Sequence, residues 1–161
     1  MKLSAGSGRR IARGEVGFDA ALLGTSFNAQ DPGRRPALIV QANNDADVLS
    51  AVRQARDLGL KIGICSGGHS WAQNHIRDGG MLIDLSRLNG ISINAAEGIA
   101  TIGPGCLAGE LNAALAKQHL FFRWPTPIQW VWAGSCFKAV LVGTVALRAS
   151  RARALSALMS C

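Results

Sequence analysis

The part of this sequence best suited to chemistry is a pair of glycines and a histidine that lie between two serines. The segment Ser66-Gly67-Gly68-His69-Ser70 directly follows residues 61–65, which are expected to form a β-strand. Glycines can adopt a positive φ and turn backbone N–H groups toward an anion such as a pyrophosphate, and the serines add hydroxyl donors. The spacing fits neither GxGxxG nor GxxxxGK[ST], so a plain strand-to-loop turn with a surface histidine is the alternative.

The apolar pattern before this segment predicts the elements that must position it. Residues 37–40 form a short apolar run, and this run and residues 61–65 are each expected to form a strand. A helix is expected between them, capped by Asn44 or Asp45. Its apolar residues recur at helical spacing: Val48, Leu49, Val52, Ala55 and Leu58. Strand, helix and strand in so short a stretch predict a βαβ unit with a parallel pair.

The pattern after the segment predicts three more strands and a helix. The strands are expected at 81–84, 91–94 and 99–102, and the glycine turns before Ile91 and Ile99 suit hairpins. The helix is expected over 107–118. The fold class is therefore α+β, with a parallel start and an antiparallel continuation. Before the turn signal at 31–36 the apolar residues are isolated, so we expect the ordered core to begin after it.

Several ordered motifs give this sequence a family resemblance. The run from Arg34 to about Phe122 resembles the PCMH-type FAD-binding domain of FAD-linked oxidases, of the berberine-bridge-enzyme-like and vanillyl-alcohol-oxidase type. SGGHS is similar to the pyrophosphate loop of that family, DLSRLNGI to the following strand and turn, and GPGCLAGEL to the segment before the next helix. The resemblance implies the first part of such a domain, incomplete, in an N-terminal fragment of an FAD-linked oxidoreductase.

The resemblance also implies a cofactor, FAD, and the residues that contact it. Ser66, Gly67, Gly68 and Ser70 match the pyrophosphate cradle, and His69 matches the histidine that in many members bonds covalently to the flavin 8-methyl carbon. A neutral imidazole is a competent nucleophile for such a bond. Gly103 and Gly105, with Pro104 between them, are expected to approach the cofactor through their backbone. No family role falls on three further residues: His75 and His119 are expected on the surface, and Trp71 in packing.

Charge divides the chain near residue 122. The sequence has 161 residues, 17 Lys and Arg and 10 Asp and Glu, and every acidic residue precedes residue 123. Residues 128–147 carry a single charge and formally match a membrane span. Read one base out of frame from Trp130 onward, however, the codons permit a glycine-rich stretch ending in GWNSR, which the family has at this point. We therefore predict a one-base deletion near the Phe122 codon.

These observations predict three parts and one main function. Residues 1–33 form an N-terminal extension, 34–122 the partial FAD-binding domain and 123–161 a frameshifted, non-native tail. By resemblance the function is FAD binding and oxidation of a CH–OH, C–N or C–C bond of a small molecule, with dioxygen as the expected acceptor. No catalytic residue is assigned in this chain, and we expect the fragment alone to be inactive. The alternatives are a non-catalytic FAD- or nucleotide-binding module and a small protein tethered to a membrane by residues 128–147.

Partners and compartment follow from composition. The basic residues before residue 123 are dispersed, which argues against a nucleic-acid partner. The four cysteines lack metal-ligand spacing, so no metal site is expected. Without a secretory leader, they predict reduced thiols in the cytoplasm. A membrane partner is not expected, and the substrate and the oligomeric state are left open.

Overall fold

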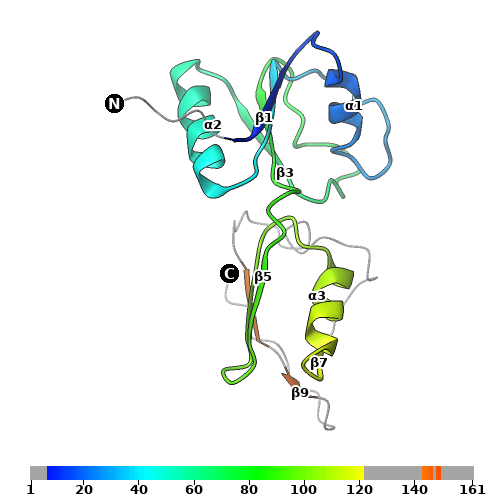
Figure 1. Ribbon diagram of the computed structural model, residues 1–161. Helices are drawn as coiled ribbons and strands as arrows, with labels where there is room; N and C mark the ends of the chain where they lie inside the picture. The colour runs from blue at the N-terminus through cyan, green and yellow to red at the C-terminus, as the bar shows by residue number, and fades with distance from the viewer. Residues whose placement is uncertain (1–6, 122–142, 147, 150–161) are drawn as a thin grey trace. The chain divides into compact units, whose positions relative to one another are not determined.

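The computed structural model describes residues 7–121 and, further along, the backbone of residues 143–146 and 148–149. The chain divides into two units, Met1–Leu88 and Asn89–Cys161, which are described separately. Every helix and strand expected from the sequence is present within a few residues of its expected bounds. The mixed α+β class is therefore confirmed (Figure 1).

The first unit is built on a four-stranded sheet. Its strands are β1 (Arg9–Ala12), β2 (Leu38–Gln41), β3 (Ile62–Cys65) and β4 (Met81–Asp84), in the order β1-β2-β4-β3. β2 and β3 each pair with β4 in parallel, while β1 is antiparallel to β2. All four residues of β4 are buried, as suits a central parallel strand.

Two details of this sheet differ from the sequence prediction. The expected parallel pair, β2 and β3, is parallel but not adjacent, because β4 lies between its members. The strand at 81–84 runs parallel to both neighbours and does not begin the antiparallel part. The reason is the connection 66–80, which crosses over without a helix, whereas a helical pattern is the usual sign of a parallel crossover.

A helix covers each face of the sheet. α1 (Phe18–Leu23) packs on one face and α2 (Asp45–Asp57) on the other, as Figure 1 shows. The core on the α1 side includes Ile11, Phe18, Leu22, Ile39 and Leu82. The core on the α2 side includes Val40, Ala51, Ala55, Met81 and Ile83. The prediction that the ordered core begins after residue 36 is therefore wrong, because Ile11, Phe18 and Leu22 belong to the core on the α1 side.

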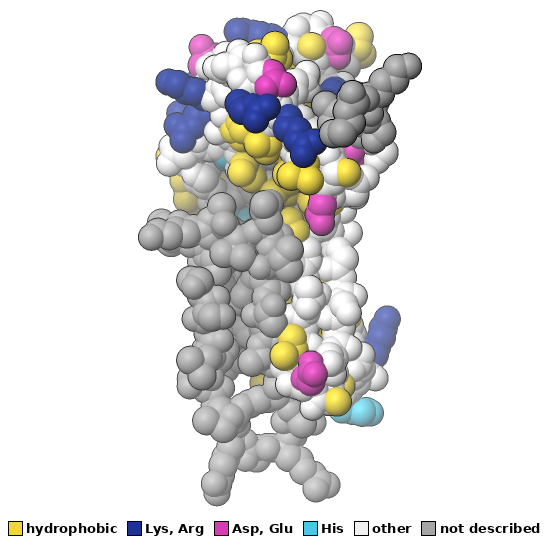
Figure 2. Space-filling view, turned by 90° about the vertical axis from the view of Figure 1, so that its left-hand side faces the viewer, with side chains coloured by type: hydrophobic (Ala, Val, Ile, Leu, Met, Phe, Trp, Pro, Cys, Tyr) yellow, Lys and Arg dark blue, Asp and Glu magenta, His cyan; other side chains and the backbone are white. Residues whose placement is uncertain are grey.

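α2 buries a narrower stripe than its apolar pattern predicts. Ala51 and Ala55 are fully buried, whereas Leu49 and Leu58 are 57% and 60% exposed. Small side chains let the helix approach the sheet closely, and Leu49, Val52 and Leu58 are left exposed. Figure 2 shows hydrophobic side chains among Lys and Arg side chains on this side of the molecule. The cap at Asn44 is confirmed, because its side chain accepts a hydrogen bond from the Asp47 N–H at 3.0 Å.

The second unit contains the expected hairpin and helix. β5 (Ile91–Asn94) and β6 (Ile99–Ile102) pair antiparallel, and α3 (Ala108–Ala116) packs on them through Leu111 and Leu115. The Glu110 carboxylate accepts a hydrogen bond from the Leu107 N–H at 3.0 Å at the start of α3. The short strands are β7 (Leu120–Phe121), β8 (Gly143–Ala146), which pairs with β6, and β9 (Arg148–Ala149), which pairs with β7.

The proposed tail falls largely outside the described residues. This applies to residues 122–142, which include most of the apolar stretch 128–147, and to residues 150–161. The frameshift and the membrane tether therefore stay predictions. Among the helices of the described residues, none is both long enough and apolar enough to cross a membrane.

Candidate functional site

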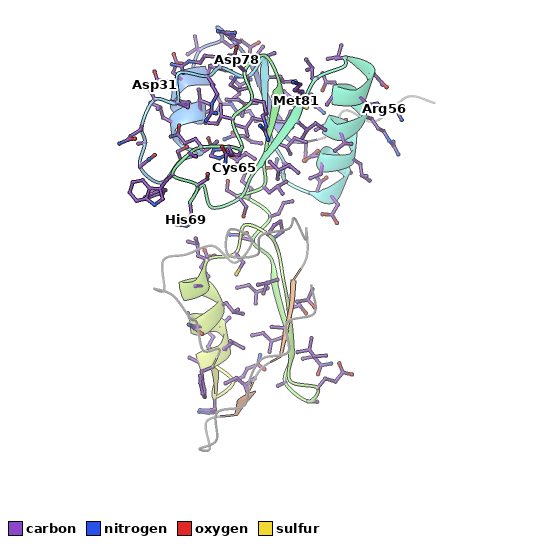
Figure 3. The ribbon with its side chains drawn as sticks, turned by 180° about the vertical axis from the view of Figure 1, so that it is seen from behind. Asp31, Arg56, Cys65, His69, Asp78 and Met81 are labelled. Atoms are coloured by element: carbon purple, nitrogen blue, oxygen red, sulfur yellow. The ribbon has the colours of Figure 1, made fainter. Side chains whose placement is uncertain are left out.

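The glycine loop 66–70 leaves the sheet at the carboxyl ends of its parallel strands. Cys65, the last residue of β3, is in register with Asp84, the last residue of β4. The Leu85 N–H donates to the Cys65 carbonyl at 2.8 Å and continues this pairing past the strand ends. Figure 3 shows His69 at this end of the unit and Asp78 at the opposite end. Ligands of open α/β sheets bind beyond the carboxyl ends of the strands, so the loop occupies the favourable edge.

A segment that follows α1 braces this loop. Gly68 has φ +63°, and a Cβ there would overlap the carbonyl of Thr25. The Phe27 N–H donates to the Gly68 carbonyl at 3.2 Å, and the Cys65 thiol donates to the Thr25 carbonyl at 3.1 Å. Residues 25–27 therefore fix the loop through backbone contacts that require glycine at position 68.

The cysteine beneath the loop is not a nucleophile. Burial, with a smaller contribution from the Asp84 carboxylate, raises the pKa of the Cys65 thiol to about 12. Burial likewise raises the pKa of Cys106 to about 11. Both thiols are free and buried, so neither is a candidate for covalent attachment of a ligand at neutral pH.

We expect native Cys65 to resist alkylation. With its pKa at about 12, roughly one thiol in ten thousand is ionised at pH 8, and burial also excludes the reagent. Iodoacetamide at pH 8 should leave Cys65 unmodified in the folded protein and modify it fully in urea, as read by peptide mass spectrometry. Rapid labelling without denaturant would show that the Cys65 thiol is accessible in the folded protein.

Among the side chains of loop 66–70, that of His69 carries the basic nitrogen. Its ring stacks on that of Phe27, with centroids 5.7 Å apart and planes at 25°. Burial lowers the pKa of His69 below its ordinary value of 6.5, so the imidazole is mainly neutral at pH 7 and keeps a lone pair on one nitrogen. Trp71 packs edge-on with the Phe27 ring, with centroids 4.8 Å apart, and is itself 76% exposed.

The two other histidines differ from each other. His75 was expected on the surface, but it is half-buried and its Nε2 lies 3.5 Å from the Ser26 hydroxyl oxygen. Burial and the Arg34 guanidinium lower its pKa. The sequence prediction of a surface position is therefore wrong for His75, which contacts Ser26 instead. His119 is exposed, as expected.

The second predicted set of site residues lies in the other unit. Gly103 and Gly105 form the turn between β6 and α3. The Gly103 N–H donates to the Gly90 carbonyl at 2.8 Å, and its carbonyl accepts from the Cys106 N–H at 3.1 Å. Both polar backbone groups of Gly103 therefore have protein partners. A cofactor contact by these glycines stays a prediction.

The residues of loop 66–70 fit a dinucleotide phosphate. Within the described part of the chain, the Gly67 N–H donates to no protein group. Gly67 has no side chain of its own, and Ser66 and Ser70, at the two ends of the loop, are only partly buried. An anion is the natural acceptor for such a donor. In the same described part, no group of three or more His, Cys, Asp or Glu could hold a metal ion.

Comparison with known proteins identifies the family. The family described as "FAD binding domain" matches residues 36–153, which include the glycine loop. The chain belongs to this family. The match continues past residue 122, the boundary that the sequence predicts for the partial domain.

Individual relatives agree with this assignment. The chain is 40% identical over 87 residues to (R)-6-hydroxynicotine oxidase of Paenarthrobacter nicotinovorans, covering 54% of this chain and 19% of that protein. Among solved structures, carbohydrate oxidase from Microdochium nivale has a TM-score of 0.67 at 27% identity, over 82% of this chain and 28% of that one. The BBE-like 1 protein of Physcomitrella patens has a TM-score of 0.63 at 27% identity, over 73% and 26%.

The comparisons confirm the resemblance drawn from the sequence motifs. The FAD-linked oxidase family, the cofactor FAD and a partial α+β domain are as predicted. The chain spans only 19% to 28% of the length of these relatives. The residues that hold FAD, and the activity of the whole protein, are therefore matters for proposal.

The sequence alone did not reveal that residues 25–27 support the loop. Thr25, Ser26 and Phe27 are about forty residues before the loop, in a stretch without apolar periodicity and before the start of the resemblance at Arg34. Only the pairing of β1 with β2 and the packing of α1 bring this stretch to the loop. The only hint in the sequence was the run of polar and aromatic residues at 25–27, between α1 and the turn at 31–36.

Proposed function

We propose that this chain binds FAD through loop 66–70, as part of an FAD-linked oxidoreductase that oxidises a small molecule. One observation carries the proposal. A neutral, half-buried histidine follows a Gly-Gly turn at the carboxyl edge of parallel strands, in a chain that belongs to an FAD-binding family. That edge is where a nucleotide is expected to bind.

Each residue of the loop has a role in this proposal. Gly67 and Gly68 let the backbone approach the pyrophosphate, and the hydroxyls of Ser66 and Ser70 add donors. His69 bonds through one ring nitrogen to the 8-methyl carbon of the flavin. We also propose that Gly103 and Gly105 approach the cofactor through their backbone, with the Gly103 N–H already bonded within its own turn.

The covalent bond and the oxidation both need an electron acceptor. His69 loses its N–H proton and replaces one hydrogen of the methyl group, so a C–N bond forms where a C–H and an N–H bond break. Bound FAD would supply the acceptor for the two electrons and two protons released, and dioxygen would take them up as hydrogen peroxide. It would supply the same capacity for hydride removal from a substrate C–H bond next to oxygen or nitrogen.

The experiment uses the full-length protein. It should purify with one FAD per chain, and a substrate should bleach the flavin without air and yield peroxide in air. Because two relatives are named as oxidases of 6-hydroxynicotine and of carbohydrate, these two compound classes are the first to try. Bound FAD that no compound of either class bleaches would favour the non-catalytic module. Absence of FAD from the protein, even after incubation with it, would overturn the proposal.

The compartment proposed is the cytoplasm. Cys65 and Cys106 are both free thiols in the structure. Unpaired cysteines are usual where the thiol pool is reduced. Fractionation of the source cells, with antibody against this chain, tests the assignment.

The reading frame carries a further prediction. We propose that residues 123–161 are read one base out of frame and that the full-length protein continues in the restored frame. Inserting one base after the Phe122 codon should give in-family sequence in which acidic residues reappear at once. Sequencing the locus on both strands checks this. A stop codon soon after the corrected junction would contradict a simple deletion.

A further inference from the structure

The ring of Phe27 lies against the reactive histidine without belonging to the core. It is 46% exposed, although a phenylalanine side chain gains most when it is buried. Its neighbour Trp71 is more exposed still. Core packing therefore does not explain why an aromatic residue occupies this position.

The position of Phe27 is set by its backbone. Its N–H donates to the Gly68 carbonyl, one residue before His69. On its N-terminal side, the Thr25 hydroxyl donates to the Leu22 carbonyl at 2.6 Å and the Thr25 carbonyl accepts from Cys65. These bonds fix the backbone on both sides of the contact, and the Phe27 ring lies stacked against the imidazole.

We propose that Phe27 is a positioning residue for His69, holding the plane of the imidazole so that a ring nitrogen faces the flavin methyl carbon. The inference rests on the proposed covalent role of His69. A stacked contact at this centroid distance restricts rotation of the imidazole about its Cβ–Cγ bond. It also covers one face of the ring, which supports the neutral form that the bond requires.

The electrostatic surroundings agree with a role for the ring contact. Burial is the cause of the lowered pKa of His69, whereas His75 on the same connection is also affected by Arg34 and Asp84. Removing the Phe27 ring exposes His69 and should raise its pKa toward 6.5. The pKa should rise because water would again stabilise the charged imidazolium.

The test measures His69 without using flavin. Full-length protein prepared free of flavin is treated with diethyl pyrocarbonate, which modifies neutral imidazole, and the rate at His69 is read by peptide mass spectrometry across a pH series. Phe27→Ala should raise the limiting rate several-fold and move the pH midpoint upward. Phe27→Tyr, which keeps the flat ring, should behave as wild type. Phe27→Leu, which keeps apolar volume without the flat ring, should raise the limiting rate as Phe27→Ala does but keep a pH midpoint close to that of wild type.

A second readout follows covalent flavin. When FAD is added to the flavin-free proteins, Phe27→Ala and Phe27→Leu should bond it several-fold more slowly than wild type and Phe27→Tyr. Trp71→Ala is the matched control, because it removes the neighbouring aromatic ring and leaves the Phe27–His69 contact. Modification of the exposed His119 gives the internal reference rate.

The outcomes separate this inference from the proposed function. If Phe27→Leu matches Phe27→Tyr in limiting rate, or if Trp71→Ala accelerates modification of His69 as much as Phe27→Ala does, Phe27 does not position the imidazole. The covalent role of His69 can still hold in that case. If wild type forms no covalent flavin, the proposed role of His69 fails, and with it the inference, whatever the modification rates are.

Discussion

Alanine in place of His69 is expected to free the flavin completely when the full-length protein is denatured. Wild-type protein precipitated with acid should keep its yellow colour, because the C–N bond from the imidazole survives loss of the fold. In His69→Ala the cofactor is held only by noncovalent contacts, which denaturation removes. Flavin fluorescence of the protein band on a denaturing gel, together with the flavin in the supernatant, measures the difference.

The competing explanation is a loop histidine that only hydrogen-bonds FAD. Wild type and His69→Ala would then both lose all flavin on denaturation, and the native affinities would differ by about 1–3 kcal/mol, the range for a bond to a charged group or a stranded polar one. His119→Ala is the matched control, since His119 is exposed and has no predicted role. Flavin retained on the polypeptide in His69→Ala would place the anchor elsewhere.

The pH dependence of flavin attachment follows from the same histidine. Because the folded protein lowers the pKa of His69 below 6.5, the reactive neutral form already predominates at pH 7. The rate of attachment should fall as the pH drops through that lowered pKa. Protonating His69 also destabilises the fold below pH 6.5, since the unfolded chain binds the proton more tightly.

The elements of the fold were largely predictable because each has a local cause. β4, β5 and β6 lie at the expected residues, since short apolar runs are separated there by glycine turns. Strand order was not predictable, because the placement of β4 between β2 and β3 depends on long-range pairing. The exposed Leu49 and Leu58 show the same limit: both alternative stripes of α2 have helical spacing, and only the sheet selects the alanine one.

The candidate site was also predictable only in part. Loop 66–70 was found because its glycines, serines and histidine are adjacent in the sequence. Its support could not be found, because Thr25 and Phe27 contact the loop only after β1 has paired with β2. His75 was misplaced for the same reason, since its contact with Ser26 joins residues far apart in the sequence. Chemistry carried by neighbouring residues is visible in a sequence, whereas the contacts that hold it are not.

The contact of residues 25–27 with the loop predicts the second large effect. Gly68→Ala should lose both stability and bound flavin. An alanine at φ +63° costs about 1–2 kcal/mol in the backbone alone. Its Cβ would also overlap the Thr25 carbonyl, which is fixed by the Cys65 thiol and cannot yield cheaply. Overpacking of this kind adds about 1–3 kcal/mol. The thermal midpoint of the full-length protein should fall, and purified Gly68→Ala should contain little FAD.

Gly59→Ala separates the two causes. Gly59 has φ +64°, but nothing lies within 4 Å of a Cβ added there. This variant should therefore show the backbone cost alone, about 1–2 kcal/mol, and keep its full complement of FAD. If Gly68→Ala is no less stable than Gly59→Ala, residues 25–27 do not press on the loop. If it is less stable but binds FAD normally, the contact with Thr25 serves the fold and the loop does not hold the cofactor.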